Sequence, residues 1–162
     1  MASGRTADVV IAGAGPAGLA TALYLLRERP QLVGRIVALE KASHPRFKVC
    51  AGGLIPKTVS ALHELGLELG VPAVQVRSGA ARTEAGTIEL RDRGEPLCTI
   101  IRRDQFDAWL ARAARQAGLE IVENTRVLGV EQEQDAVRVL CDRGVYEGRV
   151  VVGADGSGSR VR

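Results

Sequence analysis

The chain has 162 residues, of which 46% are hydrophobic and 25% charged, with a net charge of +3. This balance is typical of one globular domain. Its basic residues are scattered among acidic ones and only 3% of its residues are aromatic, which argues against a nucleic-acid partner. No apolar run approaches the ~18 residues of a membrane span, and Met1–Asp8 has no signal-like segment. Cysteines and histidines are few and widely spaced, so we expect reduced thiols, no metal site and a cytoplasmic location.

The first predicted element is a buried strand that leads into a glycine-rich turn. Val9–Ala12 is continuously apolar, as in the centre of a parallel sheet, and a G-x-G-x-x-G sequence follows it. In a dinucleotide-binding turn the first glycine makes the tight turn, the second admits the pyrophosphate, and the third lets the helix pack closely. Pro16–Arg29 is predicted to be that helix, with its free amides aimed at the phosphates. The predicted diphosphate-binding residues are Gly13, Gly15, Pro16, Ala17 and Gly18.

A second strand, Arg35–Glu40, completes a βαβ unit. Its terminal carboxylate lies about 20 residues after the glycine turn, which suits a hydrogen bond to an adenosine ribose. A carboxylate there also repels a 2′-phosphate and so argues against NADP in this pocket, although Lys41 beside it weakens that argument. We predict that Glu40 and Lys41 belong to the cofactor site; the alternative for Glu40 is a solvated strand end.

The middle of the chain predicts a loop, a helix and an antiparallel section. The loop Lys41–Gly53 ends in a Gly52-Gly53 pair, which allows either close approach to a flat ligand or an ordinary flexible loop. A helix is predicted over Pro56–Leu65, closed by Gly66. Three strand-like segments separated by glycine-containing turns follow, at Val74–Val76, Thr87–Leu90 and Leu97–Ile101.

The last third predicts one helix and then strands only. Asp104 is the predicted N-cap of a helix over Gln105–Ala117, which Gly118 ends. The predicted strands are Leu119–Val122, Arg126–Gln132, Ala136–Cys141 and Val145–Val152, the last ending in a buried run, Val150–Val152. A glycine-rich loop, Gly153–Ser159, follows at the carboxyl end of that strand, where ligands sit in open α/β sheets.

Three separated stretches resemble the flavoprotein family of p-hydroxybenzoate hydroxylase-type monooxygenases and geranylgeranyl reductases. They are Gly13–Gly18 with Glu40, then Ile101–Leu110 with its arginine before a Phe-Asp helix start, and Val152–Arg162 with its Asp-Gly motif. A fourth segment, Lys48–Leu54, is similar to the Lys-x-Cys-Gly-Gly loop of the geranylgeranyl reductase branch, with Ala51 where a glycine is common.

This resemblance implies a Rossmann-like FAD-binding domain over residues 1–162, an α/β fold with a parallel sheet plus an antiparallel β-meander. It implies FAD as the cofactor and NAD(P)H as electron donor. It places Arg103 near the FAD phosphates or ribitol, Val127 near the adenine, and Asp155 and Gly156 near the ribityl and pyrophosphate. Cys50, Gly52 and Gly53 would lie beside the isoalloxazine. Cys50 lines that pocket or is a redox thiol, and no catalytic side chain is assigned.

The function that the resemblance implies is reduction of isoprenoid double bonds. Its alternatives are oxygen insertion into an aromatic substrate, a non-catalytic nucleotide-binding fragment, and half of an NAD-dependent dehydrogenase. The antiparallel stretches and the Asp-Gly motif argue against the last. The expected partner is a small isoprenoid or aromatic molecule, with peripheral membrane contact if the substrate is a lipid. We expect an incomplete domain, because the family's later Gly-Asp motif and most of its substrate domain are not in the chain.

Overall fold

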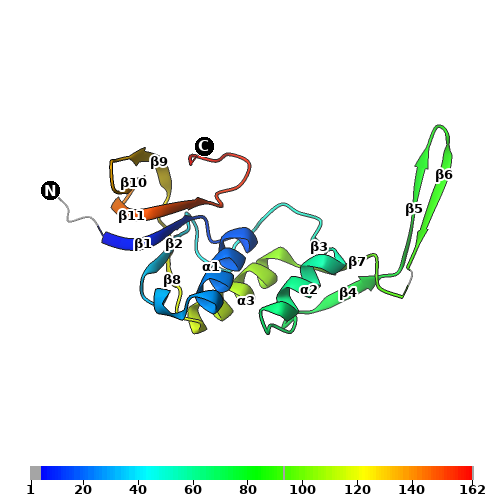
Figure 1. The fold of residues 1–162 in the computed structure, drawn as a ribbon. Helices are drawn as coiled ribbons and strands as arrows, with labels where there is room; N and C mark the ends of the chain where they lie inside the picture. Colours follow the sequence, from blue (N-terminus) through cyan, green and yellow to red (C-terminus); the bar gives the residue numbers. More distant parts are fainter. Residues whose placement is uncertain (1–4, 93, 162) are drawn as a thin grey trace. The chain divides into compact units, whose positions relative to one another are not determined.

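The computed structural model describes residues 5–92 and 94–161 (Figure 1). Residues 1–4 lie outside the described residues; they begin the Met1–Asp8 segment, for which no signal sequence was predicted. Arg162, the last residue of the third family-like stretch, also lies outside them. The chain forms two compact units, one from the chain up to Arg46 and from Asp107 onward, the other from Phe47–Phe106.

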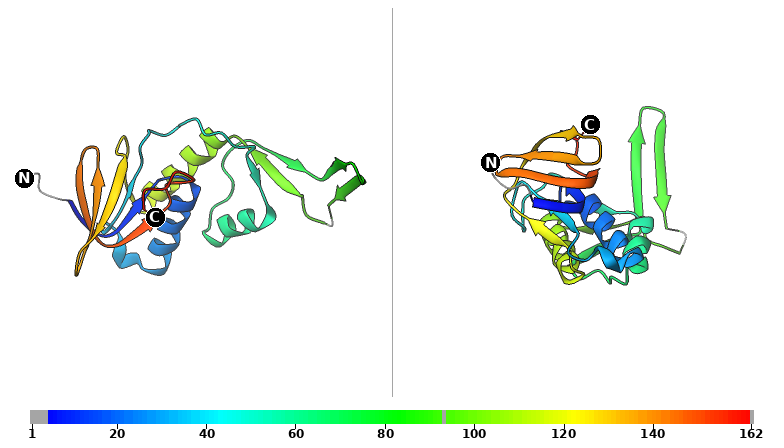
Figure 2. Two further views of the ribbon diagram at one scale, coloured as in Figure 1. Left: turned by 90° about the horizontal axis from the view of Figure 1, so that it is seen from above. Right: turned by 60° about the vertical axis from the view of Figure 1, so that its left-hand side comes forward.

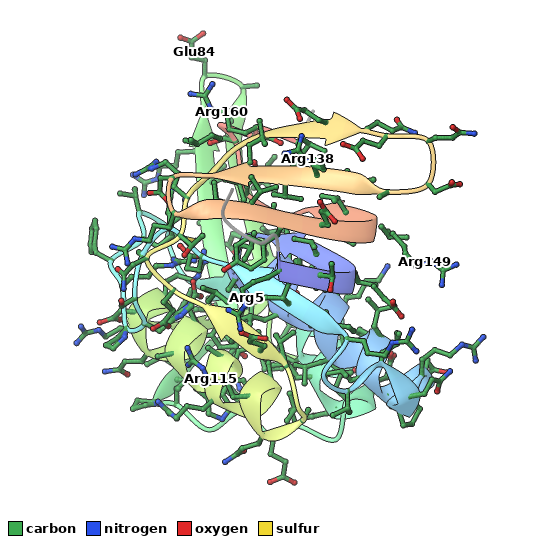
Figure 3. The ribbon with its side chains drawn as sticks, turned by 90° about the vertical axis from the view of Figure 1, so that its left-hand side faces the viewer. Arg5, Glu84, Arg115, Arg138, Arg149 and Arg160 are labelled. Atoms are coloured by element: carbon green, nitrogen blue, oxygen red, sulfur yellow. The ribbon has the colours of Figure 1, made fainter. Side chains whose placement is uncertain are left out.

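The first unit is built on a six-stranded sheet in the order β8-β2-β1-β11-β10-β9. Neighbours among β8, β2, β1 and β11 are parallel, and β9, β10 and β11 form an antiparallel meander, whose strands lie side by side in Figure 3. The predicted α/β fold with a parallel sheet and an antiparallel meander is therefore confirmed. The strands are β1 (Arg5–Ala12), β2 (Ile36–Leu39), β8 (Glu120–Val122), β9 (Val127–Gln132), β10 (Val137–Cys141) and β11 (Gly144–Gly153).

Helix α1 (Pro16–Glu28) follows β1 and covers one face of the sheet. Its buried leucines recur at helical spacing, and Ile11 of β1 points toward it. Pro30 stops the helix, and a single 3-10 turn (Pro30–Leu32) leads on to β2. The opposite face holds a second apolar cluster that joins the parallel strands to the meander: Val10, Val37, Leu39, Val139 and Tyr146. Figure 2 shows the meander continuing beside β1. Two-sided burial explains why the central strands are continuously apolar.

The second unit contains a small antiparallel sheet in the order β3-β7-β4 and a separate hairpin. Helix α2 follows β3, and α3 (Arg103–Gln116) begins in this unit and continues into the first. Every residue of the hairpin strands is exposed. The elements are β3 (Gly53–Leu54), α2 (Pro56–Glu64), β4 (Ala73–Val76), β5 (Ser78–Thr83), β6 (Gly86–Arg91) and β7 (Cys98–Ile101).

The predicted N-cap at Asp104 is wrong. Helix α3 begins one residue earlier, at Arg103, and the Phe106 N–H already donates to the carbonyl of Arg102 at 2.9 Å. The Asp104 carboxylate accepts both Nε and Nη2 of Arg102. That ion pair holds the side chain which was expected to cap the helix.

The predicted buried run at the end of β11 is also wrong. Val150 is 52% exposed, and the two valines after it are only half-buried. Val150 pairs with Val9 and shares its face of the sheet, where α1 packs against β1 and β2. An apolar run therefore does not distinguish a strand buried on both faces from one buried on a single face.

Within residues 5–92 and 94–161, no helix has the length and apolar content that crossing a membrane requires.

Candidate cofactor site

The turn after β1 needs glycine at two of its three glycine positions for reasons internal to the fold. Gly13 has a φ of +104°, and a Cβ there would overlap the carbonyl oxygen of Ala154. A Cβ on Gly18 would overlap the carbonyl oxygen of Gly13. Strand pairing fixes this approach, because Gly13 N–H donates to Leu39 O and Ala154 N–H donates to Ala12 O, both at 2.8 Å.

Gly15 differs from both. Its φ is −82°, which any residue adopts, and a Cβ there would meet only Nη2 of Arg46, at 3.4 Å. Neither backbone strain nor packing among the described residues requires a glycine at this position. Gly15 is also the N-cap of α1, which begins at Pro16, so the helix presents its first free amides beside it. The room over Gly15 and the start of α1 is the feature that fits a phosphate group.

Glu40 lies directly after β2 and is buried, with only 4% of its surface exposed. Its Oε2 accepts the Ala14 N–H at 3.1 Å, and its Oε1 accepts the Ala42 N–H at 3.2 Å. The alternative of a solvated strand end is therefore wrong. The carboxylate ties the glycine turn to the loop after β2.

Arg46 is a central residue of the site that the sequence analysis did not assign. Its Nη2 lies 3.3 Å from Oε2 of Glu40, and its Nη1 lies 3.2 Å from Oδ2 of Asp107, whose side chain is fully buried. Its Nε is buried and has no hydrogen-bond partner among the described residues. One guanidinium thus joins the loop after β2 to α3, beside Gly15. The available sequence signal was Asp107 itself, a charged residue next to Phe106 on the apolar side of a helix.

His44 is a second residue of this kind, considered in the sequence only as a metal ligand. Its side chain is 2% exposed. Nδ1 lies 2.9 Å from Oε1 of Glu123, and Nε2 lies 3.0 Å from the carbonyl oxygen of Ala14 in the glycine turn. The main-chain N–H of His44 donates to the same Oε1 at 3.0 Å, and Arg115 of α3, labelled in Figure 3, donates to it at 2.9 Å.

These donors determine the charge of Glu123. Burial opposes its ionised form, but hydrogen bonds from the His44 main chain, the Arg115 guanidinium and the His44 ring outweigh burial and lower the pKa of Glu123 from 4.5 to about 2. A carboxylate that accepts several hydrogen bonds remains ionised well into acid. Glu123 is therefore an anion at neutral pH.

The loop after β11 meets the glycine turn. Asp155 lies beside Gly13, and its Oδ2 accepts the Arg160 N–H at 2.6 Å, which closes the loop. Gly156 next to it has a φ of +88°. Val127 begins β9 and packs, half-buried, on the second apolar cluster. Lys41 is exposed. The first unit thus brings the glycine turn, Glu40 and the Asp155 loop together.

The remaining predicted residues lie in the second unit. Cys50 is exposed, and its Sγ accepts the Gly52 N–H at 3.4 Å. Gly52 has a φ of +77°, and a Cβ there would overlap the carbonyl oxygen of Ile101. Gly53 begins β3, and Arg103 is the first residue of α3. Packing on β7 by itself explains the glycine at 52.

Among the described residues, no group of three or more His, Cys, Asp or Glu side chains is placed to hold a metal ion. The family model described as an FAD binding domain matches residues 6–162. The chain belongs to this family. FAD, rather than NAD as in half of a dehydrogenase, is the cofactor that this family assignment supports.

Two curated relatives illustrate the range of this FAD binding domain. The chain is 29% identical over 163 residues to menaquinone reductase of Mycobacterium tuberculosis, covering 95% of this chain and 38% of the relative. It is 34% identical over 171 residues to 3-hydroxybenzoate 6-hydroxylase 1 of Aquipseudomonas alcaligenes, covering 96% and 42%. The chain therefore spans about two fifths of the length of each relative.

Solved structures have the same fold as this chain. The p-nitrophenol 4-monooxygenase of Pseudomonas putida has a TM-score of 0.77 at 25% identity, over 94% of this chain and 42% of that one. A geranylgeranyl bacteriochlorophyll reductase-like protein of Thermoplasma acidophilum shares the fold, with a TM-score of 0.73 at 24% identity, over 94% and 40%. Reductases and hydroxylases both occur among the named proteins, so the comparisons support a flavin-dependent oxidoreductase domain without selecting one chemistry.

Proposed function

We propose that the chain holds FAD with its diphosphate over Gly15 and the first amides of α1, as the cofactor domain of a flavin-dependent oxidoreductase. The observation that carries this is the glycine at position 15, which neither φ nor internal packing requires. Close approach of a ligand gives the missing reason. Arg46, whose Nη2 approaches Gly15, also has a buried Nε without a partner in the described chain, and its guanidinium is a donor of the kind that phosphate oxygens accept.

The other predicted contacts keep their proposed roles. Glu40, with Lys41 beside it, would face the adenosine ribose, and Val127 would border the adenine. Gly13, Pro16, Ala17 and Gly18 would shape the diphosphate cradle with Asp155 and Gly156, and Arg103 would reach the phosphates or ribitol. Cys50, Gly52 and Gly53 would lie beside the ring system.

The flavin supplies the redox chemistry when it is bound, and the protein binds and orients it. Residues 1–162 would form a single FAD-binding domain of a longer enzyme. Reduction of isoprenoid double bonds with NAD(P)H as donor is the proposed reaction, favoured by the likeness of the Lys48–Leu54 loop to the geranylgeranyl reductase branch. Hydroxylation of an aromatic substrate is the second candidate, supported by the 34% identity to a hydroxybenzoate hydroxylase.

Substitution at Gly15 tests the cofactor site. Gly15→Val places a branched side chain where the diphosphate must lie, so we expect FAD affinity to fall at least tenfold, as measured by quenching of flavin fluorescence on titration. The unfolding midpoint in urea should stay close to that of the parent chain, because the backbone at 15 suits any residue. Gly79→Val, in the exposed hairpin with open space around it, is the matched control and should bind FAD normally. Normal FAD affinity in Gly15→Val would overturn the proposal.

A further inference from the structure

Both ring nitrogens of His44 face atoms that can only accept hydrogen bonds. Nδ1 lies 2.9 Å from a carboxylate oxygen of Glu123, and Nε2 lies 3.0 Å from the carbonyl oxygen of Ala14. A neutral imidazole has one N–H and one lone pair, whereas an imidazolium has two N–H groups. Either neutral tautomer would therefore set a lone pair against an oxygen at hydrogen-bond distance. Only the doubly protonated ring satisfies both partners.

The partners of the His44 ring belong to one network of charged side chains. Glu123 is ionised and contacts the ring directly, with Arg115 on the same oxygen. Glu40 binds the N–H of Ala14, and Arg46 and Asp107 continue that network. As residue types, carboxylates ordinarily titrate in acid and guanidiniums in strong base, whereas an imidazole ordinarily changes its charge near neutral pH. Histidine is therefore the residue type in this network whose charge can change near neutral pH.

The contact at Ala14 controls a group in the proposed diphosphate site. A trans peptide is planar, with its C=O and N–H pointing in opposite directions. The carbonyl of Ala14 and the N–H of Gly15 belong to one such peptide. Holding the carbonyl against His44 therefore also fixes the direction of the Gly15 N–H.

We infer that His44, as a doubly protonated imidazolium, is a positioning residue that orients the Gly15 amide for the FAD diphosphate, so that loss of its proton weakens FAD binding. The inference rests on the proposed FAD site. Protonated His44 supports the turn, so FAD affinity should be highest at the acid end of the range and fall as the pH rises. The loss of one charge-assisted hydrogen bond corresponds to about a tenfold weaker affinity.

The protonation state can be observed without cofactor. In the chain labelled with ¹⁵N-histidine, both ring nitrogens of His44 should show shifts and couplings of protonated nitrogens at neutral pH. His63, the exposed histidine of α2, is the internal control. A single protonated nitrogen on His44 at pH 6 would overturn the inference.

Two variants of His44 distinguish a role in positioning the Gly15 amide from a role in packing alone. In His44→Gln the side-chain amide replaces Nε2, so it still donates to Ala14 but does not titrate in this range. In His44→Asn the amide replaces Nδ1, which keeps the contact with Glu123 and loses the one with Ala14. FAD dissociation constants are measured from pH 6 to 9 for both, for the parent chain and for His63→Gln.

We expect the parent chain and His63→Gln to lose about tenfold in affinity as the pH rises. His44→Gln should bind FAD with a flat pH profile, and His44→Asn should bind about tenfold more weakly throughout. Equal profiles for the parent chain and His44→Gln would overturn the inference and leave the FAD site intact. A parent chain that binds no FAD at any pH would instead overturn the proposed function.

Discussion

One arginine contacts two buried carboxylates beside the glycine turn. Arg46 is 14% exposed and lies between Glu40 and Asp107, which are almost and fully buried. Desolvating three charges is unfavourable unless each remains paired. Arg46 therefore stabilises the fold mainly because its absence would remove an ion pair from each of two buried carboxylates.

Replacing this arginine tests that balance. We expect Arg46→Met to destabilise the chain by about 3–5 kcal/mol, the range found when one partner of a buried ion pair is removed. Urea unfolding followed by circular dichroism gives the difference.

Arg138→Met is the matched control. Arg138 lies on β10, labelled in Figure 3, and pairs with Glu131 and Glu133 at the surface. Exposed pairs contribute little to stability, so this variant should unfold close to the parent midpoint. Similar losses of stability in both variants would show that the buried ion pairs of Arg46 contribute no more than exposed ones.

Glu123 predicts how stability depends on pH. Its pKa is about 2 in the folded chain against an ordinary 4.5, so its contribution is present above about pH 4.5 and is lost as the pH falls toward 2. We expect Glu123→Gln to be less stable than the parent chain at pH 7 by on the order of 1–2 kcal/mol, because hydrogen bonds to a charged group are lost from a partly solvated site. The difference should shrink steadily in unfolding curves between pH 5 and 2. A difference that is constant across this range would contradict the assigned role.

Sequence spacing identified Glu40 because a ribose-binding carboxylate follows its glycine turn at a regular distance within one βαβ unit. The same reasoning did not find His44 or Arg46. Their partners Glu123 and Asp107 follow the whole second unit in the sequence, and no local sequence pattern indicates such long-range contacts. The prediction that Asp104 caps α3 was wrong for the opposite reason. The Asp104 side chain pairs with its neighbour Arg102, although local rules assign that side chain to a cap.

At the scale of elements, helix α1 was predicted from its buried face, whereas strand β5 was not predicted. The leucines of α1 recur at helical spacing because they cover the sheet. Strand β5, Ser78–Thr83, is exposed along its whole length, so no alternation of apolar and polar residues marks it. Its pairing with β6 is held by main-chain hydrogen bonds and closed at its base, where Arg77 Nη1 lies 2.9 Å from Asp92 Oδ2.

The hairpin should therefore be dispensable for folding. Replacing Gly79–Leu90 by Asn-Gly leaves Ser78 and Arg91, which already pair, joined by a favoured two-residue turn. We expect an unchanged urea midpoint and unchanged dispersion of the remaining methyl NMR signals. A cooperative loss of structure in β1 or β11 would show that the hairpin supports more than itself.

At the scale of the whole molecule, the fold class followed from the order of local patterns. An apolar strand, a helix and a second strand predicted the parallel sheet, and turn-separated strands predicted the antiparallel meander. The strand order could not be predicted in this way, because no sequence pattern near Arg5 indicates that it pairs with Tyr146. The exposure of Val150 shows the same limit, because periodicity describes a strand without describing which elements cover it.

The parallel pairing of β1 with β11 has a consequence for synthesis on the ribosome. The glycine turn leaves the exit tunnel early, but the Ala154 carbonyl against which Gly13 packs is translated near the end of this stretch. Long-range parallel pairing waits for its second strand. A nascent chain therefore carries an unfinished nucleotide turn until β11 has been translated, and we expect cofactor capture to follow the emergence of β11.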